Sequence, residues 1–192
     1  MVIEAELKVD VHDRRTVLDG LSLRANGQAS IYRDCYYETP RRELSRHGQE
    51  LRLRTIDGSD VRHILTFKEA AVDDESGSKP EHETQIEDRG AVERTFLGLG
   101  YIVDIEFEKQ CLNFRFSEHG RNFLATVVRV PEIGDASFLE LETMVPSSDD
   151  VPAALDHIKQ VIVSLGIDPM SALNPRYYQE MVTTFRSDRL MP

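Results

Sequence analysis

The sequence predicts an α+β fold: an eight-stranded antiparallel closed β-barrel with flanking helices and a C-terminal helical segment. Three observations support this. Many short runs alternate apolar and polar residues, as half-buried strands do. Several of these runs follow one another through turn signals, which is typical of hairpins. The polar faces of four runs carry charges of both signs, which favours a closed sheet whose interior is lined by charges.

The first strand, residues 2–9, shows this pattern most clearly. Glu4, Glu6 and Lys8 alternate with aliphatic residues. Because residues two apart share a face of a strand, the three charges point one way and the aliphatic side chains the other.

The next elements are predicted by helical spacing and by turn signals. Residues 12–23 have the apolar spacing of a short amphipathic helix, and Asn26-Gly27 ends it. Residues 28–38 are rich in Ile, Tyr and Cys and predict a strand that stops before Pro40. Residues 41–49 form a polar connection.

Residues 50–56 and 61–69 predict a hairpin, because Asp-Gly-Ser-Asp joins two alternating runs. Residues 70–80 are acidic and rich in Ser and Gly, and predict a surface loop that is a candidate lid. A weakly alternating strand follows at residues 81–87.

A short helix over residues 90–99 would turn Val92, Phe96 and Leu99 inward. Three strands complete the barrel, at residues 101–116, 122–130 and 137–144.

Beyond Pro146 the apolar spacing becomes helical. Ser147-Ser148-Asp149-Asp150 would cap a helix that runs to about Leu165. A last helical segment is expected over residues 175–185. Residues 1–192 therefore predict a single domain, with barrel strands at about 2–144 and C-terminal helices at about 148–186.

Composition excludes several classes of function. The 192 residues carry a net charge of −11, which argues against binding nucleic acid or an anionic membrane. No apolar run is long enough to span a bilayer, and Glu4 and Glu6 stand where a signal peptide would be basic and then apolar, so export is not expected. The two cysteines lie far apart without metal-type spacing. A cytoplasmic location is expected.

The charged faces suggest a specific chemistry. Carboxylates at positions i and i+2 of a strand lie about 7 Å apart, and two such pairs occur, Glu4/Glu6 and Glu140/Glu142. Carboxylate oxygens hold Mg²⁺ together with substrate phosphates. Arginine and lysine bind phosphate oxygens, and the candidates here are Lys8, Arg52, Arg54, Lys68 and Lys109. Metal ligands beside phosphate-binding cations predict phosphoryl or nucleotidyl chemistry.

The alternative is that each charged strand face is a solvated surface, which is the usual case for one strand alone. Four concordant strands favour an interior. The sequence has no glycine-rich phosphate loop, and its histidines are scattered.

In these charged strands the chain resembles the CYTH superfamily of triphosphate tunnel metalloenzymes. Its opening Glu4-Ala-Glu6-Leu-Lys8 is similar to the ExExK signature of that family. Further similar segments follow in the order that the family has them, at residues 34–40, 51–54, 65–68, 138–142 and 176–180, with Glu81 and Glu83 in the following acidic strand as possible additional tunnel acids. Size and the tyrosine-rich second strand look closest to bacterial class IV adenylyl cyclases.

The resemblance implies a tunnel that binds a small triphosphate and Mg²⁺ or Mn²⁺, and the possibility of a homodimer. It implies metal ligands among Glu4, Glu6, Glu140 and Glu142. Triphosphate would be bound by Lys8, Arg52, Arg54, Lys68, Lys109 and Arg129, with Lys8, Lys68 and Arg54 acting in catalysis.

Two positions depart most clearly from the family pattern, and His82 stands near where an arginine is often found. Cys111 stands where an arginine is common, and Val128 or a neighbour stands where an aspartate is common. Arg129 and Arg115 are candidates to replace the missing positive charge.

Three functions remain open. The first is a metal-dependent adenylyl cyclase-like enzyme that converts ATP to cyclic AMP and pyrophosphate. The second is a triphosphatase acting on an inorganic or organic triphosphate such as thiamine triphosphate. The third is a triphosphate- or nucleotide-binding module without catalysis, which the two departures favour.

Overall fold

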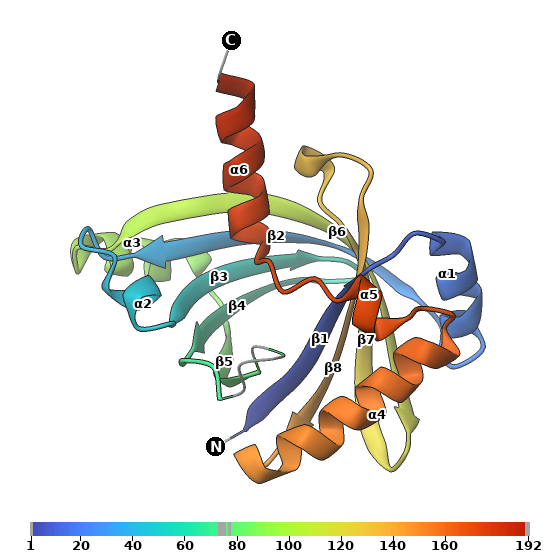
Figure 1. Ribbon diagram of the computed structural model, residues 1–192. Helices are drawn as coiled ribbons and strands as arrows, with labels where there is room; N and C mark the ends of the chain where they lie inside the picture. Colours follow the sequence, from blue (N-terminus) through green and yellow to red (C-terminus); the bar gives the residue numbers. More distant parts are fainter. Residues whose placement is uncertain (1, 73–75, 77, 191–192) are drawn as a thin grey trace.

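The computed structural model describes residues 2–72, 76 and 78–190, and its eight antiparallel strands close into a barrel, as predicted (Figure 1). The order around the barrel is β1-β5-β4-β3-β2-β6-β7-β8, so the first and last strands are neighbours. In chain order the strands are β1 (Ile3–Asp10), β2 (Gln28–Glu38), β3 (Glu50–Asp57), β4 (Val61–Lys68), β5 (Lys79–Ile86), β6 (Ile102–Glu118), β7 (Arg121–Arg129) and β8 (Ser137–Val145).

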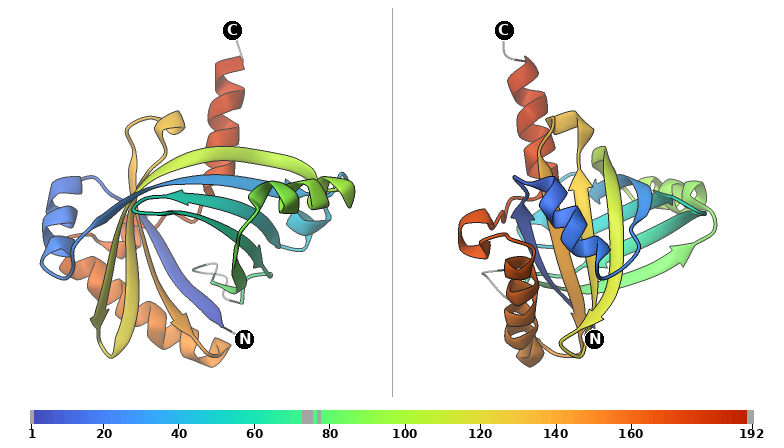
Figure 2. Two further views of the ribbon diagram at one scale, coloured as in Figure 1. Left: turned by 180° about the vertical axis from the view of Figure 1, so that it is seen from behind. Right: turned by 90° about the vertical axis from the view of Figure 1, so that its right-hand side faces the viewer.

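The helices lie outside the barrel. They are α1 (Arg14–Ser22), α2 (Glu43–Arg46), α3 (Arg89–Gly98), α4 (Val151–Ser164), α5 (Pro169–Ala172) and α6 (Tyr178–Leu190), with two short 3₁₀ turns, η1 (Pro131–Ile133) and η2 (Ser148–Asp150). Helix α4 covers the outer face of β1 and β8, and α6 projects away from the barrel (Figures 1 and 2). No helix within the described part of the chain has the length and apolar character needed to cross a bilayer.

The main hydrophobic core lies between the barrel wall and α4. The outward-facing aliphatic residues of β1 are fully or almost fully buried there. They meet the apolar stripe of α4, which the helical spacing had predicted and in which Leu155, Ile158 and Ile162 are buried. Burial of one such side chain contributes about 1.5–3 kcal/mol. Strand β1 therefore uses one face for the core and leaves its charged face for the interior.

The seam between β1 and β5 is closed by the C-terminal part of the chain. The two strands pair only at Ile3–Pro80 and Glu4–Lys79. Further along β1, Val9 forms a bridge with Leu173, and the Asn174 amide donates to the carbonyl oxygen of Lys8 at 2.9 Å. The segment that leads into α6 thus takes the place of β5 along the edge of β1.

One end of the barrel is filled by apolar side chains. Cys111, Val128 and Phe138 belong to one buried cluster, and the first turns of α6 cap it with Tyr178 and Val182. Cys111 faces Val128 across β6 and β7, and Val128 faces Phe138 across β7 and β8. This apolar end wall leaves the interior open toward the opposite end.

Several details differ from the sequence prediction. The polar connection at residues 41–49 contains helix α2, whose Leu44 and Ser45 amides donate to the Glu38 carboxylate at 3.0 and 2.8 Å. Helix α5 was not predicted. Leu99 was wrongly predicted to face inward; it lies just past the end of α3 and is 71% exposed.

The predicted surface loop at residues 70–80 ends earlier than expected, because β5 begins at Lys79. Residues 73–75 and 77 lie outside the described part of the chain, so the lid hypothesis falls largely on positions that the structure does not describe.

Candidate active site inside the barrel

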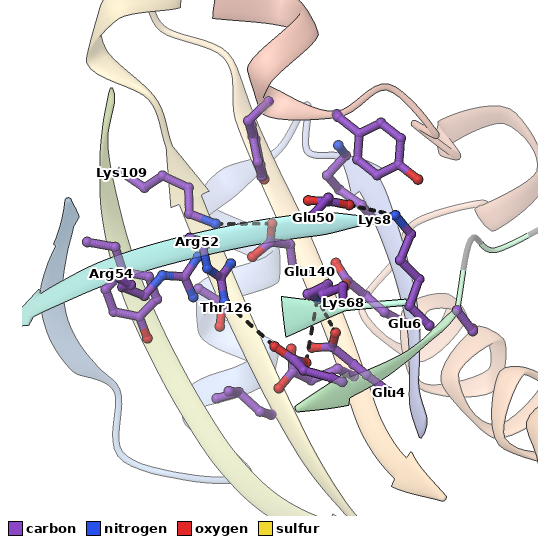
Figure 3. Close-up of a pocket in the computed structure, with 18 of the residues that line it drawn as sticks. Glu4, Glu6, Lys8, Glu50, Arg52, Arg54, Lys68, Lys109, Thr126 and Glu140 are labelled. Atoms are coloured by element: carbon purple, nitrogen blue, oxygen red, sulfur yellow. Dashed lines mark hydrogen bonds and ion pairs between the residues drawn. The ribbon is translucent and has the colours of Figure 1, made fainter. Parts of the chain in front are cut away.

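A cavity of about 450 Å³ occupies the barrel interior. Its lining includes seven acidic and seven basic side chains, which come from six of the eight strands: Glu4, Glu6, Glu50, Glu81, Glu83, Glu140, Glu142, Lys8, Arg52, Arg54, Lys68, Lys79, Lys109 and Arg115. In Figure 3 the labelled Arg52, Arg54 and Lys109 gather on one side of the cavity, and Glu4 and Glu6 lie on the other.

Three carboxylates meet at the side of the cavity formed by β1 and β8. Glu4, Glu6 and Glu142 each offer an oxygen, and these oxygens lie within 4.8 Å of one another. Glu6 and Glu142 are direct neighbours across the two strands. The Lys68 ammonium contacts the Glu4 carboxylate and lies 3.5 Å from Glu81.

The electrostatics of this cluster favour a bound cation. Burial and the neighbouring Glu4 raise the pKa of Glu6 to about 8 and the pKa of Glu142 well above its usual range. Burial acts against the charge of Glu4 as well, but the Lys68 ammonium holds the pKa of Glu4 below its usual range. Three carboxylate oxygens at this spacing suit Mg²⁺ or Mn²⁺, and such an ion would relieve their repulsion.

Glu140 lies apart from the three clustered carboxylates, among cations. Its carboxylate is 3.5 Å from the Lys109 ammonium, and it faces Lys8 across β1 and β8. Burial disfavours its charge, but Lys109 and then Lys8 lower the pKa of Glu140. The predicted set of four metal ligands therefore separates into a cluster of three and a single carboxylate further along the barrel.

Lys8 and Lys109 both approach the aromatic ring of Tyr178 in α6. Their ammonium groups lie 4.4 and 4.7 Å from the ring centroid, a distance typical of cation–π contacts. Lys8 also donates to the carbonyl oxygen of Arg176. Burial lowers the pKa of Lys8, while the neighbouring Glu140 and Glu6 favour its charged form.

The two arginines of β3 differ in how they are held. Arg54 forms a two-pronged ion pair with Asp34, at 2.6 and 2.7 Å. Arg52 donates to Thr66 at 3.1 Å and lies 3.7 Å from Glu81, while its buried Nε has no hydrogen-bond partner among the described residues. Of the two arginines of β3, Arg52 is therefore the one with unused hydrogen-bonding capacity.

Arg129 lies outside the cavity, which corrects its predicted role in binding triphosphate. On β7 the cavity is lined by Leu124 and Thr126, so Arg129 falls on the opposite face of the strand. Its guanidinium pairs instead with the exposed Asp135 at 2.7 Å. Arg115, the other candidate replacement, does line the cavity.

The two departures from the family pattern lie opposite each other. Cys111 and Val128 are cross-strand partners on the inward faces of β6 and β7, and both are buried in the apolar end wall. An inward Arg and Asp at these positions would need each other as partners in this environment. The loss of both together leaves a matched apolar pair rather than an unpaired charge.

Sequence reasoning missed several residues of the cavity. Lys79 pairs with Glu50 at 2.6 Å, and Gln179 of α6 donates to the same carboxylate at 3.1 Å. The alternation of the strands could have identified Glu50 and Lys79. Glu50 lies two residues from Arg52 on β3, and Lys79 lies two residues from Glu81 on β5, so each shares a strand face with a predicted cavity residue. Lys79 was overlooked because the strand was expected to begin two residues later.

The fold and the interior together define a class of protein: closed antiparallel barrels whose interior holds clustered carboxylates beside buried cations. Within that class the family can be named. The model of the CYTH domain matches residues 2–178, so this chain belongs to the CYTH family. Members of the family are typically metal-dependent enzymes, cyclases or triphosphatases, that bind triphosphate substrates.

Relatives are similar along nearly the whole chain. "Putative adenylate cyclase MJ0240" of Methanocaldococcus jannaschii is 23% identical, over 93% of this chain and 98% of its own length. The structure of a "putative adenylate cyclase" from Vibrio parahaemolyticus superimposes with a TM-score of 0.79 at 20% identity, over 94% of this chain and 98% of that one.

A more distant structure has the same fold with a different activity in its description. It is "Putative adenylyl cyclase HpAC1" from Hippeastrum, described as revealing a dominant triphosphatase activity. Its TM-score is 0.64 at 17% identity, and the match covers 100% of this chain and 98% of that one.

Proposed function

We propose that this protein is a divalent-metal-dependent enzyme that acts on a triphosphate, with adenylyl cyclase-like conversion of ATP to cyclic AMP and pyrophosphate as its reaction. The observation that supports this is the shared interior face: three clustered carboxylates lie in the same cavity as buried lysines and arginines. Carboxylates bind the metal and cations bind the phosphates in phosphoryl-transfer sites.

The metal would be held by Glu4, Glu6 and Glu142, with Mg²⁺ or Mn²⁺ as the ion. When bound, it would neutralise part of the charge of the triphosphate and of the leaving pyrophosphate. The other charge-stabilising contacts come from residues of the chain itself. Lys68 holds Glu4 ionised, and Glu140 lies between the two cations Lys8 and Lys109.

The triphosphate would lie along the cations of the interior. Lys109, Lys8 and Arg52 present charge that is only partly neutralised, because each has at most one carboxylate partner within 4 Å. Arg54 is engaged by Asp34, which fixes its guanidinium in place. We assign Lys8 and Lys68 the closest part in stabilising the transferred phosphoryl group, with Arg54 beside them.

Triphosphate hydrolysis is a second candidate reaction, favoured by the description of the Hippeastrum structure as having a dominant triphosphatase activity. Both reactions need the same metal and phosphate contacts. They differ in the nucleophile, which is the ribose 3′-hydroxyl in a cyclase and water in a triphosphatase.

A product assay distinguishes these reactions. The protein is incubated with Mg²⁺ or Mn²⁺ and, in parallel, with ATP, inorganic triphosphate and thiamine triphosphate, and the products are separated by chromatography. Cyclic AMP with pyrophosphate supports the cyclase, and orthophosphate supports the triphosphatase. Binding without any product would contradict both and identify a binding module. A Glu6→Gln variant controls for a contaminating enzyme, because it should lose activity with an intact fold.

A homodimer and a cytoplasmic location stay predictions. Both cysteines are free and buried, which fits a reducing compartment. Sedimentation analysis tests the dimer, and fractionation of the cells that make the protein tests the location.

A further inference from the structure

A second cavity, of about 360 Å³, adjoins the first at the open end of the barrel. The ends of β6, β7 and β8 form it. Four residues line both cavities, so the two spaces are adjacent: Arg115, Leu124, Glu142 and Met144. Ser117 and Asn122 add polar groups to the second cavity alone.

The cross-strand register places this cavity directly beside the acidic cluster. Arg115 faces Leu124, Leu124 faces Glu142, and Glu142 faces Glu6, so these residues form one row across four strands. Side chains that face each other in this way lie about 5 Å apart at their Cβ atoms. Met144 is likewise the direct partner of Glu4 on β1. Two apolar side chains thus border two metal-type carboxylates.

The chemistry of the second cavity differs from that of the first. Leu124 and the half-exposed Met144 offer apolar contact area. Arg115 is exposed, and within the described part of the chain its guanidinium has no ion-pair or hydrogen-bond partner. A guanidinium without a partner stacks well on a planar ring, and thioether and aliphatic side chains pack against ring faces. A phosphate group alone would not use the apolar part of this surface.

The order of the cross-strand rows of inward-facing side chains indicates how a bound molecule would be oriented along the barrel. Next to the row that contains Leu124 lies a polar row with Thr126 and Glu140, and beyond it lies the apolar end wall of Cys111 and Val128. That end is closed by α6. Away from this closed end, a group attached to a triphosphate in the main cavity can extend toward Leu124 and Met144.

We propose that the second cavity binds the organic group on the α-phosphate of the substrate, a nucleoside or similar planar heterocycle, and so makes the protein select organic triphosphates over inorganic triphosphate. This inference rests on the proposed function of the main cavity. It adds that the last phosphate points toward the closed end and that the heterocycle lies against Arg115, Leu124 and Met144.

The test compares two ligands on the same variants. Binding of ATP and of inorganic triphosphate, each with Mg²⁺, is measured by calorimetry for the wild type, for Met144→Ser and for the double variant Leu124→Ser/Met144→Ser. The expected result is at least a fivefold weaker affinity for ATP, with the affinity for inorganic triphosphate changed less than twofold. Arg115→Gln should weaken ATP binding more than it weakens triphosphate binding. Val61→Ser, an exposed apolar position elsewhere on the barrel, is the matched control.

Two results would overturn the inference. Equal weakening for both ligands would mean that these residues act on the phosphates, and no weakening for either would mean that the organic group lies elsewhere. If the wild type binds neither ligand with metal, the proposed function itself fails, and this outcome is distinguishable from the other two. Met144 is 50% exposed, so its substitution tests the cavity without removing a core residue. Thermal denaturation confirms that each variant is folded.

Discussion

At the scale of single residues, the ion pair between Asp34 and Arg54 shows how the charges of the interior depend on one another. Asp34 is 2% exposed, and burial disfavours its charge. The Arg54 guanidinium nevertheless holds the pKa of Asp34 below its usual range. Because the pair is buried and two-pronged, each partner satisfies a charge that would otherwise be stranded.

Asp34→Asn should lower the free energy of unfolding by about 3–5 kcal/mol, because it leaves the buried Arg54 charge unpaired. The pH dependence follows from the lowered pKa. The stabilisation is complete above the unfolded pKa of about 3.9 and is lost as the pH falls toward the folded value. Urea denaturation at pH 7 and near pH 3 checks this, since the gap between wild type and variant should narrow in acid.

The matched control is Asp57→Asn. Asp57 also pairs with an arginine, Arg33, at 3.2 Å, but both side chains are about half exposed. Its loss should cost less than about 1 kcal/mol. Equal effects of the two substitutions would contradict the role assigned to burial.

The acidic cluster makes a second prediction for single residues. Mg²⁺ or Mn²⁺ should raise the melting temperature of the wild type, because a bound ion relieves the repulsion among Glu4, Glu6 and Glu142 and binds only the folded state. Glu6→Gln should abolish most of this increase. Glu83→Gln should retain it, since Glu83 lines the cavity but lies outside the cluster. An increase that survives in Glu6→Gln would place the metal elsewhere.

Strand alternation predicted which side chains enter the interior, and it did so because a strand has a fixed period of two. The sequence could not show which residues meet across strands. Glu140 and Glu142 look like a pair in the sequence, yet Glu142 meets Glu6, while Glu140 faces Lys8. Register depends on the pairing of β1 with β8, which are more than a hundred residues apart.

At the scale of elements, helix α6 closes the barrel and contributes to the cavity. Its contacts are of two kinds. Tyr178 and Val182 are buried in the apolar end wall, whereas Arg186 pairs with Glu132 of η1 on the surface. The two kinds of contact should differ in their effect on stability.

Val182→Ala should lower the free energy of unfolding by about 2 kcal/mol, because the side chain is fully buried and its loss leaves a void. Arg186→Ala should cost less than about 1 kcal/mol, since its ion pair is solvent-exposed. Chemical denaturation of both variants measures the difference. A larger effect of Arg186→Ala would mean that the surface contact, and not the apolar wall, holds α6.

The longer elements were predictable, and the four-residue helices were not. Helix α4 has an apolar stripe over several turns, which gives a clear helical period. Helices α2 and α5 are single turns without such a period. Helix α2 depends instead on the Glu38 carboxylate, which accepts hydrogen bonds from its first amides and lies on the preceding strand. A helix that is stabilised by such a tertiary contact has no periodic apolar pattern in its own sequence.

At the scale of the whole molecule, the charge of the cavity differs from that of the protein. The chain carries −11, whereas the cavity is lined by equal numbers of acidic and basic side chains. When all of these groups are ionised, their charges cancel and do not attract a triphosphate, and the surrounding protein repels it. One or two divalent cations would make the interior positive.

Triphosphate binding should therefore require metal. In calorimetry with EDTA, the affinity for inorganic triphosphate should fall at least tenfold relative to the affinity with Mg²⁺. A control titration with Arg129→Gln should match the wild type, because Arg129 lies outside the cavity. Tight binding in EDTA would show that the lysines and arginines suffice without the ion.

The pairing of the first strand with the last has a consequence for how the protein is made. Strand β1 leaves the ribosome first, but β8 begins only at Ser137. At about 5–20 residues per second, β1 waits on the order of ten seconds for this partner. During that interval the acidic cluster cannot exist, since Glu142 has not been synthesised. The alternating Glu and Lys side chains of β1 protect its open edges from pairing with other nascent chains.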